Sequence, residues 1–297
     1  MKAIFSISIF LCVIILCSCE KIVTIKQQQY QSKLSIQGLI TPGQKPAIYI
    51  NRTVPYFDPK INTRALTVDN ATVVLNDGTN NYSFQFDSSY DYFYCRYDYF
   101  YKGAQNIQAN KTYTLTVNYN GNIYTAVAVT NQSVVPITST GYTPDFTDLY
   151  GGHEGVIIKY TDKPGEENFY RYEMGRIIDT SVLTAGAGIK SNCLGDQTYY
   201  IKEIGRTIYP DKNVDGLALS FEFEPAYTHQ KDDTAYIHLQ SVDKNIFNFY
   251  NNLDEQKLAQ YNPFVEPVFI APGQFKDAIG VFGAYAVSDS VLFIYPE

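Results

Sequence analysis

The sequence predicts a mainly β fold, with two antiparallel β-sandwich-like domains and one C-terminal amphipathic helix. Apolar and polar residues alternate in many short segments that are separated by turn residues. An alternation with a period of two places apolar side chains on one face of a strand. The 297 residues include 27 Tyr and 18 Phe, and aromatic residues favour strands. A hydrophobic fraction of 45% is enough for a sizeable core.

The N-terminal residues 1–18 are predicted to be a lipoprotein signal peptide. An apolar run from Ala3 to Leu16 follows Lys2, and it is shorter than the roughly 20 residues of a transmembrane helix. Leu16-Cys17-Ser18-Cys19 resembles a bacterial lipobox, in which the last Cys is acylated. We therefore expect lipidation at Cys19 and a body held to the membrane by acyl chains. The alternative is an ordinary signal peptide with chance cysteines.

Residues 19–32 are expected to form a tether between the lipid and the body, because they are polar and rich in Gln. Glu20 follows the lipidated Cys. An Asp there would favour retention in the inner membrane, so we expect delivery to the outer membrane of a Gram-negative bacterium. The expected location is lipid-anchored in that membrane and facing the cell surface, and these residues leave the choice of membrane face open.

Residues 33–133 are expected to form the first β-sandwich domain. Asn76-Asp77-Gly78 and Asn120-Gly121 each close a hairpin, since Asn and Gly accept the positive φ angles of tight turns. Residues 53–70 are predicted to be a long loop. The strands are predicted at 34–40, 47–51, 71–75, 82–86, 112–119 and 123–129.

Residues 134–297 are expected to form the second β domain, after a boundary at 131–155 where the periodicity is weak. Its helix is predicted at 243–260, because apolar residues recur there with helical spacing. Asp243 or Ser241 is expected to cap its start. The strands are predicted at 156–160, 169–178, 198–201, 217–223, 235–242, 280–285 and 291–295.

The aromatic run, residues 90–101, is the strongest candidate for a binding surface. Eight of its twelve residues are aromatic. A strand turns alternate residues to opposite faces, so part of this run is expected to point away from its own core. Tyr suits such half-wet contacts. A buried strand, or a hairpin packed on the second domain, remains the alternative. The candidate binding residues are Tyr90, Tyr92, Tyr94, Tyr97, Tyr99 and Tyr101.

Two cysteines remain in the body after processing, Cys95 and Cys193. In an oxidising compartment they could form a disulfide. Their separation in the sequence does not determine their geometry, so two buried thiols are the alternative.

No metal site, cofactor or catalytic site is expected. His153, His229 and His238 lack zinc-site spacing. Residues 211–216 alternate oxygen-bearing side chains, as calcium loops do, but they lack the bidentate Glu and flanking helices, so a solvated turn is favoured. Catalytic motifs are absent, and the protein is predicted not to be an enzyme. A net charge of −7 argues against nucleic-acid binding.

Several segments together resemble a known family. They are the start at Cys19-Glu20-Lys21, the strand at 34–38, the hairpin containing Gly103 and 113–117, and the C-terminal segments 262–264 and 280–285. Their order and spacing resemble the lipoprotein family called domain of unknown function 4249, over roughly residues 19–290. The resemblance implies outer-membrane lipoproteins of Bacteroidota-type bacteria, often encoded beside TonB-dependent receptors. It implies no enzymatic activity.

The expected function is therefore that of an outer-membrane lipoprotein without catalytic activity. It would be a binding or accessory subunit of a TonB-dependent transporter and would aid ligand capture or uptake. Its expected partners are a TonB-dependent outer-membrane receptor and, through the acyl chains, the lipid bilayer. A surface adhesin or envelope-structural lipoprotein is the alternative, and an extracellular hydrolase is a third reading.

Overall fold

The computed structural model describes residues 30–55, 62–148, 151–179, 198–205, 207–227, 229–261 and 273–296. The chain forms two compact units, Met1–Gln31 and Ser32–Glu297. The predicted signal peptide, Cys19 and most of the tether lie outside the described residues. The fold below is that of the second unit. Among the described residues, no helix is both long and apolar enough for a membrane span.

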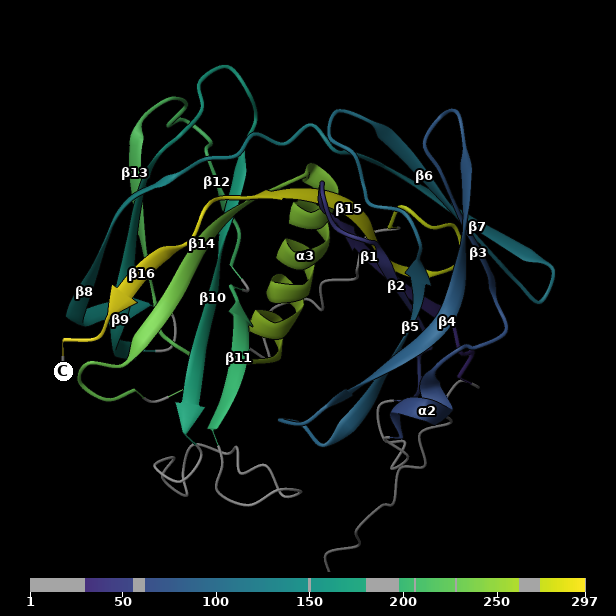
Figure 1. Cartoon of the computed structure of the whole chain (residues 1–297), viewed down its shortest axis with the longest axis horizontal. Coiled ribbons are helices and arrows are strands. Elements are labelled where there is room, and N and C mark those ends of the chain that lie inside the picture. The colour runs from purple at the N-terminus through teal and green to yellow at the C-terminus, as the bar shows by residue number, and fades with distance from the viewer. Residues whose placement is uncertain are drawn as a thin grey trace, which may run out of the picture. The chain divides into compact units, whose positions relative to one another are not determined.

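The prediction of a mainly β fold with one prominent C-terminal helix is confirmed (Figure 1). In chain order the elements are β1 (Leu34–Ile40), β2 (Ala47–Arg52), α2 (Thr63–Leu66), β3 (Thr72–Asn76), β4 (Asn81–Asp91), β5 (Arg96–Gly103), β6 (Thr112–Tyr119), β7 (Asn122–Val129), β8 (Ile137–Asp148), β9 (Gly151–Thr161), β10 (Phe169–Asp179), β11 (Thr198–Ile204), β12 (Tyr209–Pro210), β13 (Ala218–Phe223), β14 (Thr234–Val242), α3 (Lys244–Tyr261), β15 (Ile279–Val287) and β16 (Val291–Ile294).

The strands form one large sheet and one small sheet. The large sheet has the order β11-β10-β14-β15-β1-β2-β5-β4-β3-β6-β7, with β12 beside β10 and β16 beside β14. The small sheet has the order β13-β9-β8. Neighbouring strands are antiparallel, apart from the parallel pair of β1 and β15. Strands from both predicted domains therefore share the large sheet.

Strand β15 joins the two halves of the large sheet. Its residues 279–284 pair with β1, and its residues 285–287 pair with β14. Gly280 has a φ of 140°, and a Cβ atom there would lie 1.8 Å from the Ile36 carbonyl oxygen. Only glycine accommodates this close approach between the two backbones. The division into domains at 133/134 stays a prediction about independent folding.

Two main cores lie on either side of this junction. The first is built from inward residues of β1–β7, and it includes Phe282 and Ala284 of β15. The second lies between the small sheet and the β10–β14 part of the large sheet, where apolar residues of the facing strands meet. This second arrangement is a sandwich, as the alternating pattern predicted. Its fully buried large side chains include Tyr170, Met174, Ile158 and Tyr295.

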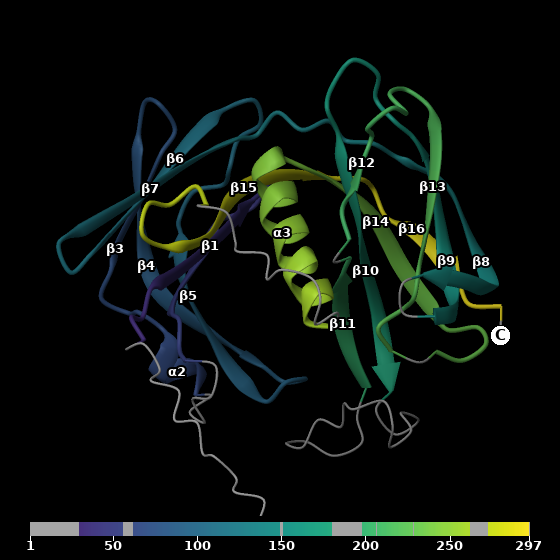
Figure 2. The ribbon, with the colours of Figure 1, turned by 180° about the vertical axis from the view of Figure 1, so that it is seen from behind.

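Helix α3 packs at the junction between the halves (Figure 2). Ile246 is completely buried, and the Phe247 ring stacks on Phe169 of β10 at 4.3 Å. The Asp243 carboxylate caps the helix, because its Oδ1 accepts the Ile246 backbone N–H at 2.9 Å. Its other oxygen accepts the Ala284 N–H at 2.7 Å, which ties the helix to β15. Burial raises the pKa of Asp243 to about 6.

Two segments differ from their predicted structure. The expected boundary at 131–155 contains most of the long β8–β9 hairpin. Register shifts interrupt this hairpin between Ile137 and Ser139 and between Thr143 and Phe146, which blurs the period of two. The loop expected at 53–70 contains α2, whose start is capped by the Asn62 side chain.

Candidate functional site: an aromatic hairpin tip and the cleft beside it

The aromatic run forms the tip of the β4–β5 hairpin. Strand β4 ends at Asp91 and β5 begins at Arg96, so residues 92–95 of the run form the turn and residues 96–101 belong to β5. One Asp91 carboxylate oxygen accepts the backbone N–H groups of Phe93 at 2.9 Å and Tyr94 at 3.0 Å. Cys95 adopts a φ of 52°, which completes the reversal. The aromatic side chains are thereby divided among several directions.

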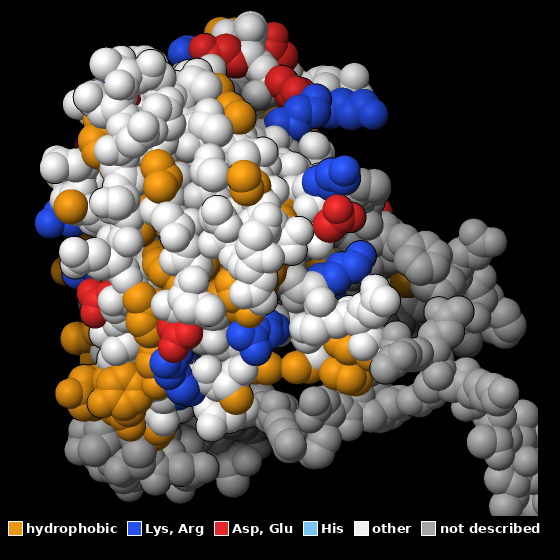
Figure 3. Space-filling model, turned by 90° about the vertical axis from the view of Figure 1, so that its right-hand side faces the viewer, with side chains coloured by type: hydrophobic (Ala, Val, Ile, Leu, Met, Phe, Trp, Pro, Cys, Tyr) orange, Lys and Arg blue, Asp and Glu red, His pale blue; other side chains and the backbone are white. Residues whose placement is uncertain are grey.

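Four of the candidate tyrosines gather on the hairpin itself. The Tyr90 ring lies 4.9 Å from both the Tyr92 and the Tyr97 rings, and Tyr97 lies 6.1 Å from Tyr99. Tyr92 is 61% exposed and Tyr97 is 50% exposed. Figure 3 faces the side formed by the first half of the chain, and hydrophobic side chains gather toward its lower end. Tyr92 and Tyr97 therefore present exposed rings at the hairpin tip.

The remaining part of the run contributes to packing within the protein. Phe93 is buried, and its ring lies 5.6 Å from Tyr199 and 5.7 Å from Tyr227. The Tyr94 hydroxyl lies 3.1 Å from the Tyr227 hydroxyl. Tyr101 is a core residue whose hydroxyl donates to the Val68 carbonyl at 3.1 Å. The tip therefore joins the first half of the chain to the second.

Cys95 lies in the same turn and is disulfide-bonded. Cys193, the predicted partner, lies outside the described residues. The pairing of these two cysteines stays a prediction.

A cleft of about 780 Å³ opens beside Tyr94, between the two sheets of the sandwich. We call it the aromatic cleft. One wall comes from β11 and β12, and the other comes from β13 and the residues after it. Its lining residues are Tyr94, Phe146, Tyr172, Lys202, Glu203, Ile204, Thr207, Tyr209, Glu222, Phe223, Glu224, Ala226 and Tyr227. Its volume lies within the range of small-ligand sites, roughly 300–1,000 Å³.

Aromatic rings line this cleft and pack beside it. Tyr172 of β10 and Phe223 of β13 stack at 3.5 Å, and Tyr209 stacks on Phe221 at 4.4 Å. Burial raises the pKa of Tyr172 above its usual value, so its hydroxyl stays protonated at neutral pH. This surface can contact flat apolar groups, and the hydroxyls can direct hydrogen bonds.

A buried ion pair supports the cleft. Arg176 is 2% exposed, and its Nε lies 2.8 Å from Glu203 Oε1. Glu203 Oε2 accepts the Ala226 N–H at 2.8 Å, and the Arg176 guanidinium donates to the Tyr227 carbonyl. The pair thus fixes both the strand β11 and the segment that contacts the hairpin tip. Since charges this deep need partners, the pair holds the walls in one geometry.

The rim of the cleft is acidic. Lys202 is paired with Glu173 at 2.6 Å, whereas Glu222 is exposed and Glu224 lies 3.4 Å from His153 Nδ1. Such a rim favours cationic groups and hydrogen-bond donors over anions. The cleft can therefore bind a molecule that combines flat apolar groups with donors or positive charge.

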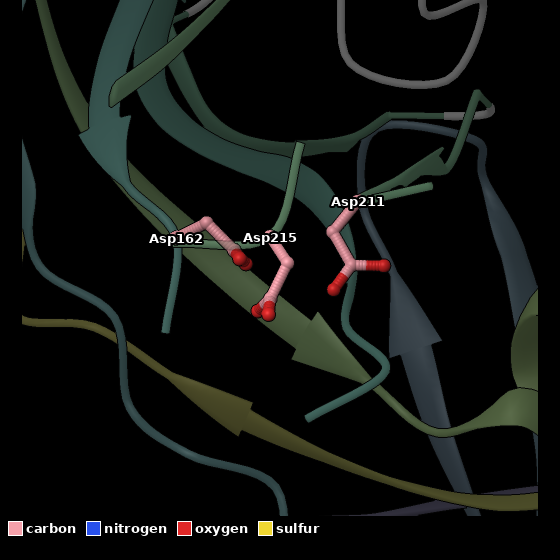
Figure 4. A group of neighbouring side chains, drawn as sticks. All are labelled: Asp162, Asp211 and Asp215. Atoms are coloured by element: carbon pink, nitrogen blue, oxygen red, sulfur yellow. The ribbon is translucent and has the colours of Figure 1, made fainter. Parts of the chain in front are cut away.

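Three carboxylates meet elsewhere, at the end of β9 and in the loop after β12. One oxygen each of Asp162, Asp211 and Asp215 lies within 4.8 Å of the others, and Figure 4 shows the three side chains turned toward a shared space. Oxygen ligands of this kind could hold calcium. Burial, together with the charges of the other two, raises the pKa of Asp211. These are the only described residues that gather three such groups.

Donors within the protein already form hydrogen bonds with the three carboxylates of this acidic cluster. Asp162 accepts the Tyr170 hydroxyl at 2.6 Å and the Gly216 N–H at 2.7 Å. Asp215 accepts the Gly165 N–H at 2.8 Å, and Asp211 accepts the Asn168 N–H at 3.1 Å. The cluster therefore connects two loops through hydrogen bonds. The sequence pattern at 211–216 indicated a turn but not the approach of Asp162.

The three histidines lie apart from this cluster. His229 stacks on Tyr295 at 3.9 Å, and His238 Nδ1 lies 2.9 Å from the Ser288 carbonyl oxygen. His153 contacts Glu224 as described above. The sequence did not predict that Glu203 and Tyr227 line the cleft or that Arg176 supports it. Isolated residues on distant strands carry no local motif, so the sequence offers no signal for them.

A model of the protein family described as Domain of unknown function (DUF4249) matches residues 20–290. No curated protein matches the sequence.

Proposed function

We propose that this chain, which belongs to the family described as Domain of unknown function (DUF4249), is a lipid-anchored outer-membrane binding protein. It captures a ligand without catalysing a reaction and works as an accessory subunit of a TonB-dependent transporter. One observation carries this proposal: a partly exposed group of tyrosines and a ligand-sized cleft lie at the same hairpin tip. We call this group, Tyr90, Tyr92, Tyr97 and Tyr99, the tyrosine cluster.

The lipobox supports the anchoring. Acylation of Cys19 would place residues 20–32 between the bilayer and the folded body. Fully extended, these residues span at most roughly 45 Å. A body held so close to the membrane meets a membrane partner at high effective concentration, so weak contacts suffice for association.

The tyrosine cluster supports partner binding. Tyr92 and Tyr97 offer apolar rings with polar tips, and such residues are enriched in protein interfaces. The turn is fixed by Asp91 and by the buried Phe93, so the cluster is presented rigidly. A rigid surface loses little conformational entropy when it binds.

The test is a pull-down of the tagged, lipidated protein from gently solubilised outer membranes, with the bound proteins identified. We expect a TonB-dependent barrel in stoichiometric amount. Replacing Tyr92 and Tyr97 with Ser should weaken the association about thirtyfold or more, because truncated interface tyrosines each cost about 1 kcal/mol or more. Tyr236→Ser is the control, since Tyr236 is 49% exposed on β14.

Three results would contradict the proposal. The first is the absence of any barrel under several mild detergents. The second is a deletion strain that loses surface attachment but keeps uptake, which would indicate an adhesin. The third is turnover of an extracellular polymer that stops when one cleft carboxylate is replaced, which would indicate a hydrolase.

A further inference from the structure

The walls of the aromatic cleft are edge strands. Among the described strands, β11 pairs only with β10, and β13 pairs only with β9. An edge strand presents backbone N–H and C=O groups that no neighbouring strand uses. Two such edges flank the stacked rings of Tyr172 and Phe223, which we call the aromatic floor.

The hydrogen bonds show which residues of β11 turn their backbone toward the free edge. The Gly205 N–H donates to the Tyr172 carbonyl at 2.9 Å, one step beyond the pair Glu173–Ile204. Bonded and non-bonded pairs alternate along an antiparallel ladder. Glu203 therefore bonds to β10, whereas Lys202 and Ile204 direct their backbone groups outward. Both of these residues line the cleft.

The same argument applies to β13. The Asp162 N–H donates to the Leu217 carbonyl at 2.9 Å, one step beyond the pair Ala218–Thr161. Alternation then turns Phe223 toward β9 and Glu222 toward the free edge. Glu222 also lines the cleft. Each wall thus offers backbone donors and acceptors above an aromatic floor.

We propose that the aromatic cleft binds an extended peptide by strand addition, with basic side chains at the acidic rim and aromatic or apolar side chains against the floor. Main-chain hydrogen bonds to an edge supply affinity in this mode, and alternate side-chain pockets supply specificity. In an extended peptide, side chains alternate between two faces. One face reaches Tyr172 and Phe223, and the other reaches Glu222 and Glu224. This inference rests on the proposed binding role of the cleft, but not on the transporter.

The test uses the full-length lipidated protein in detergent and a blocked hexapeptide of three Lys-Tyr repeats, with binding measured by calorimetry. We expect saturable binding. The same peptide methylated on every backbone nitrogen should bind about tenfold more weakly, because neither of its two edges can donate hydrogen bonds to the protein.

A matched pair of variants locates the binding. Lys202→Pro removes an outward N–H and no bond to β10, and an edge strand tolerates Pro at such a position. This variant should bind the peptide about tenfold more weakly than the wild type. Lys202→Gln keeps the N–H and removes only the bridge to Glu173, so its affinity should stay within about twofold. Circular dichroism checks that both variants fold. If Lys202→Pro does not fold, the comparison of the methylated and unmethylated peptides on the wild-type protein is the test of strand addition.

Several results would overturn the inference. Equal binding of the methylated and unmethylated peptides would exclude strand addition. Binding of maltohexaose without binding of the peptide would assign the cleft to saccharides. No binding of either up to about 1 mM would remove the peptide site. A peptide that binds while no barrel is recovered in the pull-down would contradict the transporter role alone, and a recovered barrel without peptide binding would contradict this inference alone.

Discussion

Strand β4 is bounded by two turns that share their local chemistry and differ in what they contact. At its start, Asp77 Oδ1 accepts the backbone N–H groups of Thr79 at 2.9 Å and Asn80 at 2.7 Å. At its end, Asp91 accepts those of Phe93 and Tyr94 in the same pattern. The first turn is polar, and its Asp77 also accepts a bond from Lys111 Nζ at 3.1 Å. The second is aromatic, and its Phe93 packs against the other half of the chain.

The difference shows that a turn's backbone bonds and its tertiary role are set by different residues. In both turns an Asp accepts the backbone N–H groups two and three residues ahead, and a residue with positive φ completes the reversal. The residues that follow decide whether the tip stays in solvent or contacts a distant core. The aromatic tip therefore holds the two halves together and also exposes the tyrosine cluster.

The largest loss of stability is expected from breaking the buried Arg176–Glu203 pair, which holds the segment that the aromatic tip contacts. Arg176→Met leaves Glu203 buried with no cationic partner, and we expect a loss of about 3–5 kcal/mol in the free energy of unfolding. Adding Glu203→Gln removes the stranded charge and keeps an acceptor for Ala226. Urea unfolding should then recover more than half of the loss. Equal stability of the single and double variants would mean that the pair does not support the tip.

Phe93→Ala should produce the next largest effect. Phe93 is 7% exposed, and removing its ring opens a cavity beside Tyr199 and Tyr227. The expected loss is about 3–4 kcal/mol in urea unfolding. Tyr92→Ala is the matched control in the same turn, and it should cost less than about 1 kcal/mol, because Tyr92 is mostly exposed. Similar losses for the two would show that the tip does not dock.

The stability contributed by the polar turn that contains Asp77 should depend on pH. The Asn80 and Thr79 N–H groups, with Tyr82 and Lys111, hold the pKa of Asp77 well below its usual value. The unfolded chain therefore binds the proton first, so this stabilisation is present above about pH 4 and is lost as the pH falls further. Asp77→Asn should be less stable than the wild type at neutral pH, and the gap should narrow below about pH 4 in urea titrations.

The equivalent change at the other end of the strand sharpens this result. Asp91 accepts the two backbone bonds but, among the described residues, no ammonium bond like that from Lys111 to Asp77 at 3.1 Å. Asp91→Asn should therefore cost less free energy of unfolding at neutral pH than Asp77→Asn. A stability difference between Asp77→Asn and the wild type that does not change with pH would contradict the lowered pKa of Asp77.

The smallest effect is expected at Tyr94. Tyr94→Phe removes the hydroxyl contact with Tyr227 and keeps the ring, so the loss should be about 0.5–1 kcal/mol. Tyr97→Phe, at an exposed ring of the same hairpin, should be nearly neutral. A loss above about 2 kcal/mol for Tyr94→Phe would mean that the hydroxyl pair carries the docking instead of Phe93.

The sequence predicts the local elements well, because their signals are local. Asn120 and Gly121 adopt positive φ angles of 49° and 78° between β6 and β7, as an Asn-Gly hairpin requires. The helix predicted at 243–260 spans Lys244–Tyr261 with Asp243 as its cap. Both signals lie within a few adjacent residues.

The sequence does not predict how these elements join. The parallel pairing of β1 with β15 connects residues about 240 apart, and period-two patterns do not specify a partner. Burial of Phe93 beside exposed Tyr92 depends on the turn that interrupts the run at 92–95. The Arg176–Glu203 pair and the approach of Asp162 to Asp211 arise only when distant strands meet.

Site-specific photo-crosslinking in living cells tests the proposed role of the aromatic tip most directly. A photoreactive residue replaces Tyr92 in one strain and Thr79, which is exposed in the polar turn of the same β4, in another. We expect a crosslink to a TonB-dependent barrel from position 92 and none from position 79. Crosslinks of equal yield from both positions, or none from position 92 in a strain that retains uptake, would contradict the account.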